Sequence, residues 1–247
     1  TLQRHLQRMR DPRAARSRRR LYLEACDLII LMQGQAGRFL KKGDFAAKNT
    51  LDRERFLSEF DHFHRHFIGG LRRLTPSPGD EDILRRFYGD IACECAALPR
   101  AYCHRDFQSR NLMVRRGRLH LIDFQDARMG PYTYDAASLL RDSSLDVDDD
   151  LVNEMTGYLA RGLDRGPEEF RNDFDLVALQ RNIKDLGTFA AMATTRGLAS
   201  YLEYIPRTLR SIRNTLIRSR RYDPLFSCLE EFVLTYGRRS SGAVKRA

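Results

Sequence analysis

Two short polar segments decide the fold: His104-Arg105-Asp106-Phe107-Gln108-Ser109-Arg110-Asn111 and, further along the chain, Asp123-Phe124-Gln125. Between them, the apolar runs Leu112 to Val114 and Leu119 to Ile122 are separated by Arg115-Arg116-Gly117. Two apolar runs on either side of a short polar turn with glycine are typical of a β-hairpin. The sequence therefore predicts a loop, a hairpin and a second loop, with the two polar segments at the same end of the hairpin.

The side chains that this arrangement gathers suit the transfer of a phosphoryl group. Such a reaction needs one carboxylate to orient the attacking hydroxyl and further oxygen ligands to hold magnesium against the phosphates. A loop can present Asp106 and Asn111 together, and a hairpin can return Asp123 to the same place. The alternative is structural: Asp106 and Asn111 would cap a turn, and Asp123 would end a strand.

Helices are predicted on the amino-terminal side of this segment. Apolar residues from Tyr22 to Gln33 follow a helical pattern that we expect to end at Gly34 and Gly37. Four phenylalanines between Phe56 and Phe67 recur at spacings of four and three, which places them on one helix face ahead of Gly69-Gly70. A third amphipathic pattern runs from Leu84 to Pro99.

The chain beyond Pro131 is predicted to be helical again, with its clearest break at Gly166-Pro167. The acidic run Asp148 to Asp150 precedes an apolar pattern that starts at Leu151, and acidic groups favour the amino end of a helix. There is no internal repeat. We therefore expect one α+β domain over residues 1–247, mainly helical, with a small β-hairpin insert.

Composition describes an ordinary globular chain without a membrane span. The 247 residues are 42% hydrophobic and 31% charged, and the longest apolar runs are far below the roughly 18 residues that a spanning helix needs. Five cysteines, an odd number, argue against a secreted disulfide scaffold and favour a reducing cytoplasm. The chain begins at Thr1 rather than Met, which led us to expect a fragment with sequence missing upstream.

The net charge of +10 raises the question of nucleic-acid binding. Much of the excess lies at the ends, in Arg13 to Arg20 and from Arg207 to Arg246. We expect residues 1–20 and 238–247 to be flexible basic ends, and we do not expect nucleic acid as a partner because no binding motif accompanies the charge.

Residues 103–142 resemble the catalytic segment of the aminoglycoside-phosphotransferase and choline-kinase superfamily. His104 to Asn111 matches the H-R-D-x-x-x-x-N catalytic loop, and Asp123-Phe124-Gln125 stands where this superfamily replaces D-F-G by an Asp-aromatic-polar triplet. The segment most resembles bacterial cell-wall-recycling kinases that phosphorylate the anomeric hydroxyl of N-acetylmuramate and N-acetylglucosamine. The further motifs that carry this likeness are Gly130-Pro131, Tyr134-Asp135, Leu139-Leu140-Arg141-Asp142 and Gln180-Arg181-Asn182-Ile183-Lys184.

The resemblance implies the carboxyl-terminal lobe of a protein-kinase-like fold, with ATP and Mg²⁺ as cofactors and a small sugar as substrate. Such kinases also have an amino-terminal β lobe with a Gly-rich loop over the phosphates. Gly34-Gln35-Ala36-Gly37 lacks the required pattern. The amino-terminal lobe is therefore expected in the full-length protein, and this chain alone is expected to be weak or inactive.

Roles for the catalytic segment follow from the same resemblance. Asp106 would be the catalytic base, and Asn111 and Asp123 the magnesium ligands. Met113 and Ile122 would form the apolar floor under adenine, although both could equally be core residues.

The resemblance also implies roles outside that centre. Arg181 and Lys184 would bind the substrate, and His104 and Asp135 would support the loop. An aminoglycoside or choline-type kinase is the alternative enzyme, and it would need a dense acidic pocket for a polycation. A non-catalytic binding module without a nucleotide lobe is the alternative of another class.

Overall fold

A computed structural model describes residues 1–8, 15–39, 44–219 and 229–234. Helices dominate these residues, as predicted, and two small antiparallel sheets accompany them. The α-helices are α1 (Leu2–Arg8), α2 (Ala15–Phe39), α3 (Phe45–Lys48), α4 (Arg53–Phe63), α5 (Pro78–Ala97), α6 (Tyr134–Leu140), α7 (Asp149–Gly162), α8 (Pro167–Thr195) and α9 (Ile205–Arg218). The elements η2 (His64–Leu71) and η6 (Glu230–Leu234) are π-helices, and η3 (Phe124–Asp126) and η4 (Ala199–Tyr204) are 3₁₀-helices.

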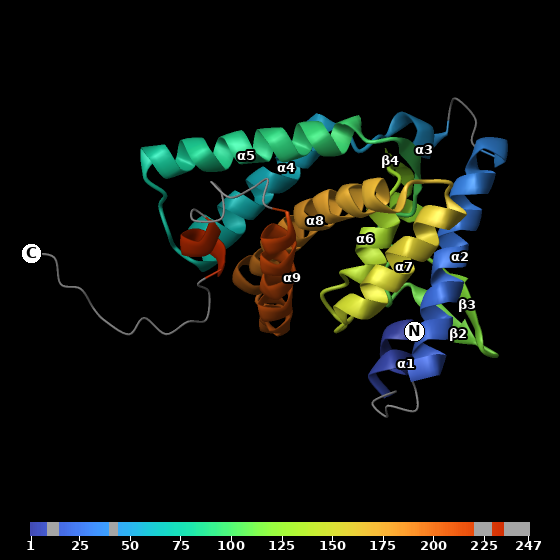
Figure 1. Cartoon of the computed structure of the whole chain (residues 1–247). Coiled ribbons are helices and arrows are strands. Elements are labelled where there is room, and N and C mark those ends of the chain that lie inside the picture. The colour runs from blue at the N-terminus through green and yellow to red at the C-terminus, as the bar shows by residue number, and fades with distance from the viewer. Residues whose placement is uncertain (9–14, 40–43, 220–228, 235–247) are drawn as a thin grey trace, which may run out of the picture.

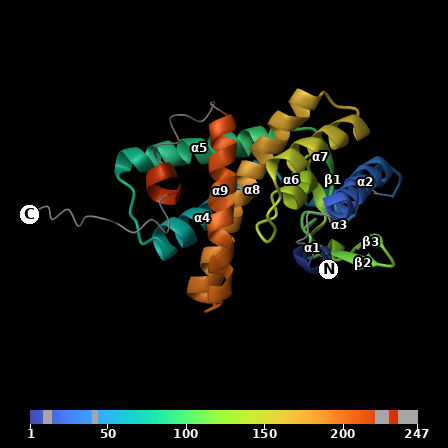
Figure 2. The ribbon, with the colours of Figure 1, turned by 60° about the horizontal axis from the view of Figure 1, so that its bottom comes forward.

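The long helix α8 crosses the middle of the molecule and joins its two sides (Figure 1). On one side it packs against α4, η2 and α9, and α5 covers α4 from outside (Figure 1). On the other side it packs against α6 and α7, which α2 covers in turn (Figure 1). The second view shows α9 lying across α8 (Figure 2). Buried residues on both sides of α8 therefore form one hydrophobic core.

The phenylalanine stripe predicted from the sequence is the centre of the packing between α4 and α8. Phe56, Phe60, Phe63 and Phe67 are all fully buried, and Phe63 stacks on Phe67 with ring centroids 5.5 Å apart. The helix widens into the π-helix η2, His64–Leu71, which carries Phe67 and continues through Gly69 and Gly70. The two helices approach closely at Gly187, where a Cβ atom would lie 2.6 Å from the Cα of Phe63.

Two helix boundaries near the amino end differ from the prediction. Helix α2 continues through Gly34 and Gly37 to Phe39, because glycine lowers the stability of a helix without by itself ending it. Residues 1–20 were expected to be a flexible basic end, but Leu2–Arg8 forms α1, and Leu2 and Leu6 are buried against the core. Residues 238–247, the other expected basic end, lie outside the described residues.

The predicted hairpin is confirmed by the pairing of β2 (Leu112–Arg115) with β3 (Arg118–Leu121), in which Leu112 lies opposite Leu121. A second pair, β1 (Arg100–Cys103) with β4 (Arg128–Pro131), was not predicted. Neither of these four-residue strands shows a clean alternation of apolar and polar residues, which is the signal that predicts strands. The two pairs together hold both ends of the polar loop 104–111.

The later helices agree with the prediction. Helix α7 begins after the N-cap Asp148, whose carboxylate accepts the backbone N–H of Leu151 at 2.8 Å, and α8 begins at Pro167 after Gly166. Within the part of the chain that the structure describes, none of the helices is long and apolar enough to cross a membrane.

Candidate active site

The loop 104–111 connects β1 to β2, and its first turn is held by a buried carboxylate. Asp135, on α6, accepts the backbone N–H groups of His104 at 2.7 Å and Arg105 at 2.9 Å. Arg105 has a φ of 72°, which is uncommon for a residue other than glycine. Such a conformation persists only when its surroundings impose it, and such residues concentrate at functional sites. Asp135 therefore sets the backbone shape just before Asp106.

A second carboxylate holds the far end of the same loop. Asp142, two residues beyond the end of α6, accepts the backbone N–H and the hydroxyl of Ser109 at 3.0 and 2.6 Å through one oxygen. Its other oxygen accepts the backbone N–H and the hydroxyl of Ser144 at 2.8 and 2.7 Å. Because Asp135 and Asp142 come from one short segment, α6 and its C-terminal turn fix both ends of the loop relative to each other.

Side chains from α4 and α8 complete the support beneath Arg105. Its guanidinium pairs with Glu59 at 3.0 Å, and Glu59 also accepts a hydrogen bond from the amide of Gln180 at 2.8 Å. The buried guanidinium of Arg181 donates to the backbone carbonyl of Arg105 at 3.2 Å and lies over the ring of Tyr134, 4.7 Å from its centroid. Buried charges are tolerated where they are paired in this way. The loop is therefore supported from three helices.

The hairpin brings the predicted metal ligands to one place. The side-chain amide of Asn111 donates to the backbone carbonyl of Asp106 at 2.9 Å, which leaves its amide oxygen for a cation. The backbone N–H of Ile122 donates to the carbonyl of Asn111 at 3.1 Å, so Asp123 follows directly from the open end of the hairpin. His104 ties the loop to the same point through a 3.0 Å contact between Nε2 and the carbonyl of Ile122.

Asp123 presents an exposed carboxylate from an unusual backbone conformation. Its φ and ψ are 72° and 60°, in the left-handed region, and it precedes the short helix η3 without capping it through its side chain. The side chain therefore has no structural bond of that kind to give up when it binds a ligand. Like Arg105, it is a non-glycine residue held in a sparsely populated conformation beside Asp106.

Burial changes the proton affinity of the groups under the loop. Removal from water raises the pKa of Asp135 to about 7, although its two backbone N–H bonds act in the opposite direction. Burial lowers the pKa of His104 and so favours its neutral form, with Nε2 as the donor to Ile122. Burial alone would raise the pKa of Glu59, but the positive charges of Lys184 and Arg105 hold it below its usual value.

Asp106 lines a cavity of about 480 Å³ between the loop and the C-terminal half of α8. One wall carries three aromatic rings that contact one another: Phe189 lies 6.1 Å from Tyr201 and 5.4 Å from Tyr204, centroid to centroid. The opposite wall is polar and includes Gln3, Gln108 and Arg110. Lys184 and Asp185 lie on the α8 side. A cavity with an aromatic wall and a few placed polar groups is typical of a small-molecule site.

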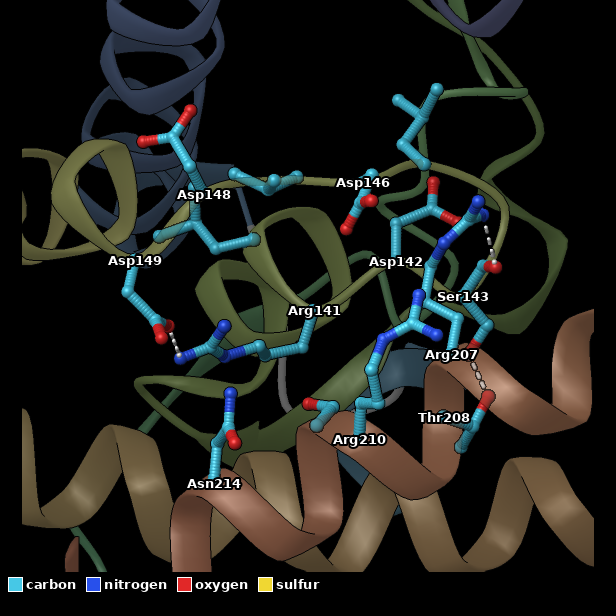
Figure 3. Close-up of a pocket in the computed structure, with 14 residues that line it drawn as sticks. Arg141, Asp142, Ser143, Asp146, Asp148, Asp149, Arg207, Thr208, Arg210 and Asn214 are labelled. Atoms are coloured by element: carbon cyan, nitrogen blue, oxygen red, sulfur yellow. Dashed lines mark hydrogen bonds and ion pairs between the residues drawn. The ribbon is translucent and has the colours of Figure 1, made fainter.

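A second, smaller cavity of about 200 Å³ shares Asp142 with the first and lies between the loop after α6 and helix α9 (Figure 3). Several of its residues contact one another: Arg141 pairs with Asp149 at 2.8 Å, and Arg207 donates to the backbone carbonyl of Ser143 at 3.0 Å. Thr208 also donates to the hydroxyl of Ser143 at 2.8 Å (Figure 3). These contacts join α9 to the segment that carries Asp142.

The exposed face of the hairpin carries apolar side chains among basic ones. Met113 and Ile122 are 38% and 45% exposed, and the neighbouring Phe124 is 47% exposed. These values exclude the alternative that Met113 and Ile122 are core residues. Since strand residues alternate between the two faces of a hairpin, Met113 and Ile122 share one face. Their use as an adenine floor stays a prediction. The exposed ring of Phe124, from the second polar segment, packs against His104 with ring centroids 4.7 Å apart.

The donor set fits Mg²⁺ bound together with phosphates. Among the residues that the structure describes, no group of three or more His, Cys, Asp and Glu side chains could hold a metal by itself. Mg²⁺ usually binds through one or two carboxylates and completes its octahedron with substrate phosphates and water. The carboxylate of Asp123 and the amide oxygen of Asn111 match this requirement, because both are oxygen donors and the backbone bond between Ile122 and Asn111 holds the two residues close together.

The structure separates the two predicted substrate-binding residues. Lys184 lines the cavity with Asp106, whereas Arg181 is only 2% exposed and points beneath the loop. The position of Arg181 therefore does not support the expected contact with a substrate. Its guanidinium already donates to the carbonyl of Arg105 and lies over the ring of Tyr134. His104 and Asp135 lie where a role in supporting the loop requires. Glu59 was missed, since no sequence signal links a carboxylate on a phenylalanine-rich helix to a loop 46 residues away.

Comparison with known proteins shows which family of proteins the chain resembles. Residues 7–171 match the phosphotransferase enzyme family. The chain belongs to this family. The match covers the loop, the hairpin and the two carboxylates on and after α6, and it confirms the resemblance read from the catalytic segment.

Two curated relatives, both named as kinases of N-acetylated sugars, are similar to this chain. An N-acetylmuramate/N-acetylglucosamine kinase of Neisseria meningitidis serogroup B is 33% identical over 189 residues, which are 74% of this chain and 57% of the relative. A protein of the same name from Pseudomonas aeruginosa is 33% identical over 127 residues, 49% of this chain and 38% of the relative. The chain thus spans little more than half the length of the first relative and less of the second.

A solved structure shows the same fold as this phosphotransferase chain. The complex of gentamicin with APH(2″)-IIa superposes with a TM-score of 0.53 and 14% sequence identity, covering 78% of this chain and 62% of that one. At this level of identity the likeness concerns the fold alone, and it confirms the predicted kinase-like, mainly helical architecture.

Proposed function

We propose that this chain is the catalytic lobe of an ATP-dependent kinase that phosphorylates the anomeric hydroxyl of an N-acetylated amino sugar, N-acetylmuramate or N-acetylglucosamine. The observation that carries the proposal is the position of Asp106, which lines the cavity on one side and is tied to Asn111 on the other. The names of the two curated relatives supply the substrate class.

Each residue has a chemical task under this proposal. Asp106 orients the sugar hydroxyl and takes its proton as the new bond to phosphorus forms. Asn111 and Asp123 would hold Mg²⁺, which when bound neutralises charge on the transferred phosphoryl group. Asp135 and Asp142 keep Asp106 in place through the loop backbone, since a shift of about 1 Å at such a residue can cost roughly 10²-fold in rate.

An anomeric hydroxyl makes modest demands on the base. It is more acidic than an ordinary sugar alcohol, and phosphoryl transfer has a loose transition state that asks little of the nucleophile. A carboxylate that mainly orients the hydroxyl and takes its proton late is sufficient. The part-buried position of Asp106 at the cavity wall suits that role.

The cavity gives less support to a polycationic acceptor such as an aminoglycoside. Besides Asp106 its lining contains two acidic residues, Asp142 and Asp185, and two cations, Arg110 and Lys184, that offset their charge. Asp142 accepts four hydrogen bonds from Ser109 and Ser144, and Asp185 lies 3.9 Å from the ammonium of Lys184. A site for a polycation needs carboxylates that are free to pair with it.

The proposal is tested with the full-length protein, ATP and Mg²⁺. Each sugar is incubated separately, and the products are followed by phosphorus NMR, which distinguishes an anomeric phosphate from phosphate on another oxygen. We expect sugar 1-phosphates, and we expect Asp106→Asn to lower turnover by about 10² to 10⁴ while the circular dichroism spectrum is unchanged. Phosphate on a non-anomeric oxygen, or consumption of only kanamycin-like amines or choline, would refute the proposal.

A further inference from the structure

We infer that Lys184 recognises an anionic acceptor, and that it is the residue that favours an acid sugar such as N-acetylmuramate over the neutral N-acetylglucosamine. This inference rests on the proposed function and deepens it. The two sugars differ in the carboxylate of the lactyl group, so discrimination between them needs a cation in the acceptor cavity.

Two cations line the cavity, and their environments differ. The side chain of Lys184 is 18% exposed, whereas Arg110 is exposed to solvent. An ion pair in open solvent contributes little because water and salt screen it. A mostly buried ammonium interacts more strongly with a ligand charge, since the surrounding dielectric is lower. Lys184 is therefore the better placed of the two to discriminate by charge.

The existing contacts of Lys184 leave it able to bind a further anion. Its Nζ lies 3.9 Å from the carboxylate of Asp185, which is beyond normal hydrogen-bond distance. The charge of Lys184 also lowers the pKa of the buried Glu59. The Lys184 side chain therefore lies close both to Glu59, which supports the loop, and to the cavity. A lysine ammonium has three donors, and these long-range interactions do not use them.

Arg181 cannot serve in the same way. It lies on the same helix one turn earlier, but its guanidinium is directed beneath the loop, to the carbonyl of Arg105 and the face of Tyr134. It is absent from the cavity lining, which Lys184 enters together with Thr188 one turn further along α8. The helix thus turns one cation toward the loop and the next toward the acceptor.

The aromatic wall orients the sugar toward Lys184. Phe189, Tyr201 and Tyr204 form a three-ring cluster, with Tyr201 and Tyr204 at 6.0 Å and an interplanar angle of 79°. Aromatic rings offer a rigid apolar surface, and the tyrosine hydroxyls can bond to an amide or hydroxyl group. A sugar ring with its C–H face on this wall and its anomeric hydroxyl at Asp106 has Lys184 on the α8 side of the cavity.

The test compares kcat/KM for the two sugars in the full-length protein and in Lys184→Met, a substitution of similar length without charge. We expect kcat/KM for N-acetylmuramate to fall about 10- to 100-fold more than that for N-acetylglucosamine, the range for loss of a charged hydrogen bond. The loss should be in KM, because the carboxylate is held equally in the ground and transition states. Lys184→Arg should retain most of the preference.

Lys48→Met, an exposed lysine on α3 outside the cavity, is the matched control and should leave the ratio between the sugars unchanged. Because misfolding lowers both activities together, the ratio is insensitive to damage to the fold. An unchanged ratio in Lys184→Met, a ratio changed instead by Arg110→Met, or a wild-type protein that phosphorylates only the neutral sugar would overturn the inference. A wild-type protein that phosphorylates neither sugar would overturn the proposed function itself.

Discussion

The carboxylate of Asp142 accepts both the backbone N–H and the hydroxyl of Ser109, at 3.0 and 2.6 Å, and so holds the end of the loop that carries Asp106. Asp135 does the same at the start of the loop. Both carboxylates belong to α6 or to the turn that follows it. One helix of seven residues and the turn after it therefore hold the loop of the candidate active site in place, in addition to the contacts within the loop.

The metal ligands can be tested through the magnesium requirement. We expect Asp123→Asn and Asn111→Ala to raise the Mg²⁺ concentration for half-maximal activity of the full-length protein by about tenfold or more, because the first removes the negative charge of one protein oxygen ligand and the second removes the other ligand altogether. Asp146→Asn, an exposed carboxylate at the second cavity, is the control. Magnesium-dependent ATP binding measured by calorimetry should weaken in parallel. An unchanged magnesium dependence in both variants would remove Asn111 and Asp123 from the metal site.

Arg181→Ala separates a supporting role from a substrate contact. The substitution leaves the buried carbonyl of Arg105 without its donor, which costs about 1–3 kcal/mol in the free energy of unfolding. We expect turnover with N-acetylmuramate and N-acetylglucosamine to fall by the same factor, because the displaced loop serves both acceptors. Denaturant unfolding and kinetics with the two sugars measure the two effects. A selective loss with the acid sugar would mean that Arg181 contacts its carboxylate.

The close approach of α8 to α4 predicts a steric effect at Gly187. A methyl group there would lie 2.6 Å from the Cα and 2.8 Å from the backbone nitrogen of Phe63, and neither atom can rotate away. We expect Gly187→Ala to lower the free energy of unfolding by about 1–3 kcal/mol. Gly34→Ala is the control, since a Cβ on that exposed helical residue meets no atom within 4 Å, and it should be neutral or stabilising. Equal effects of the two substitutions would contradict the observed packing.

Burial of Asp135 predicts a pH-dependent contribution to stability. Its pKa rises from 3.8 in the unfolded chain to about 7 in the folded protein. Between these values the folded state holds a proton that the unfolded state has released, so the free energy of unfolding falls as the pH rises. We expect the stability difference between wild type and the non-titrating Asp135→Asn to shrink by a few kcal/mol from about pH 4 to about pH 7 and then stay constant. Chemical denaturation across this range measures it, and a difference that stays constant from about pH 4 to about pH 7 would show that Asp135 is ionised in the fold throughout this range.

The amino-acid sequence is sufficient to predict the elements that depend on local patterns. The spacing of Phe56, Phe60, Phe63 and Phe67 predicts a buried helix face, and the polar turn Arg115-Arg116-Gly117 predicts the hairpin that brings Asn111 near Asp123. These features depend on the period of a helix or on the residues of a turn, so they can be recognised without knowledge of distant contacts. The family resemblance was likewise carried by residues close together in the chain.

The amino-acid sequence does not show which cation faces the loop and which faces the cavity, because the packing of the helices sets these directions. Arg181 and Lys184 are three residues apart on one helix, and no local pattern shows that the first lies under Arg105 and the second beside Asp106. The same is true of Glu59, whose partners Arg105 and Gln180 lie 46 and 121 residues away in sequence. The orientation of a helix about its axis depends on all the helices packed around it, which is why such assignments become visible only in the folded molecule.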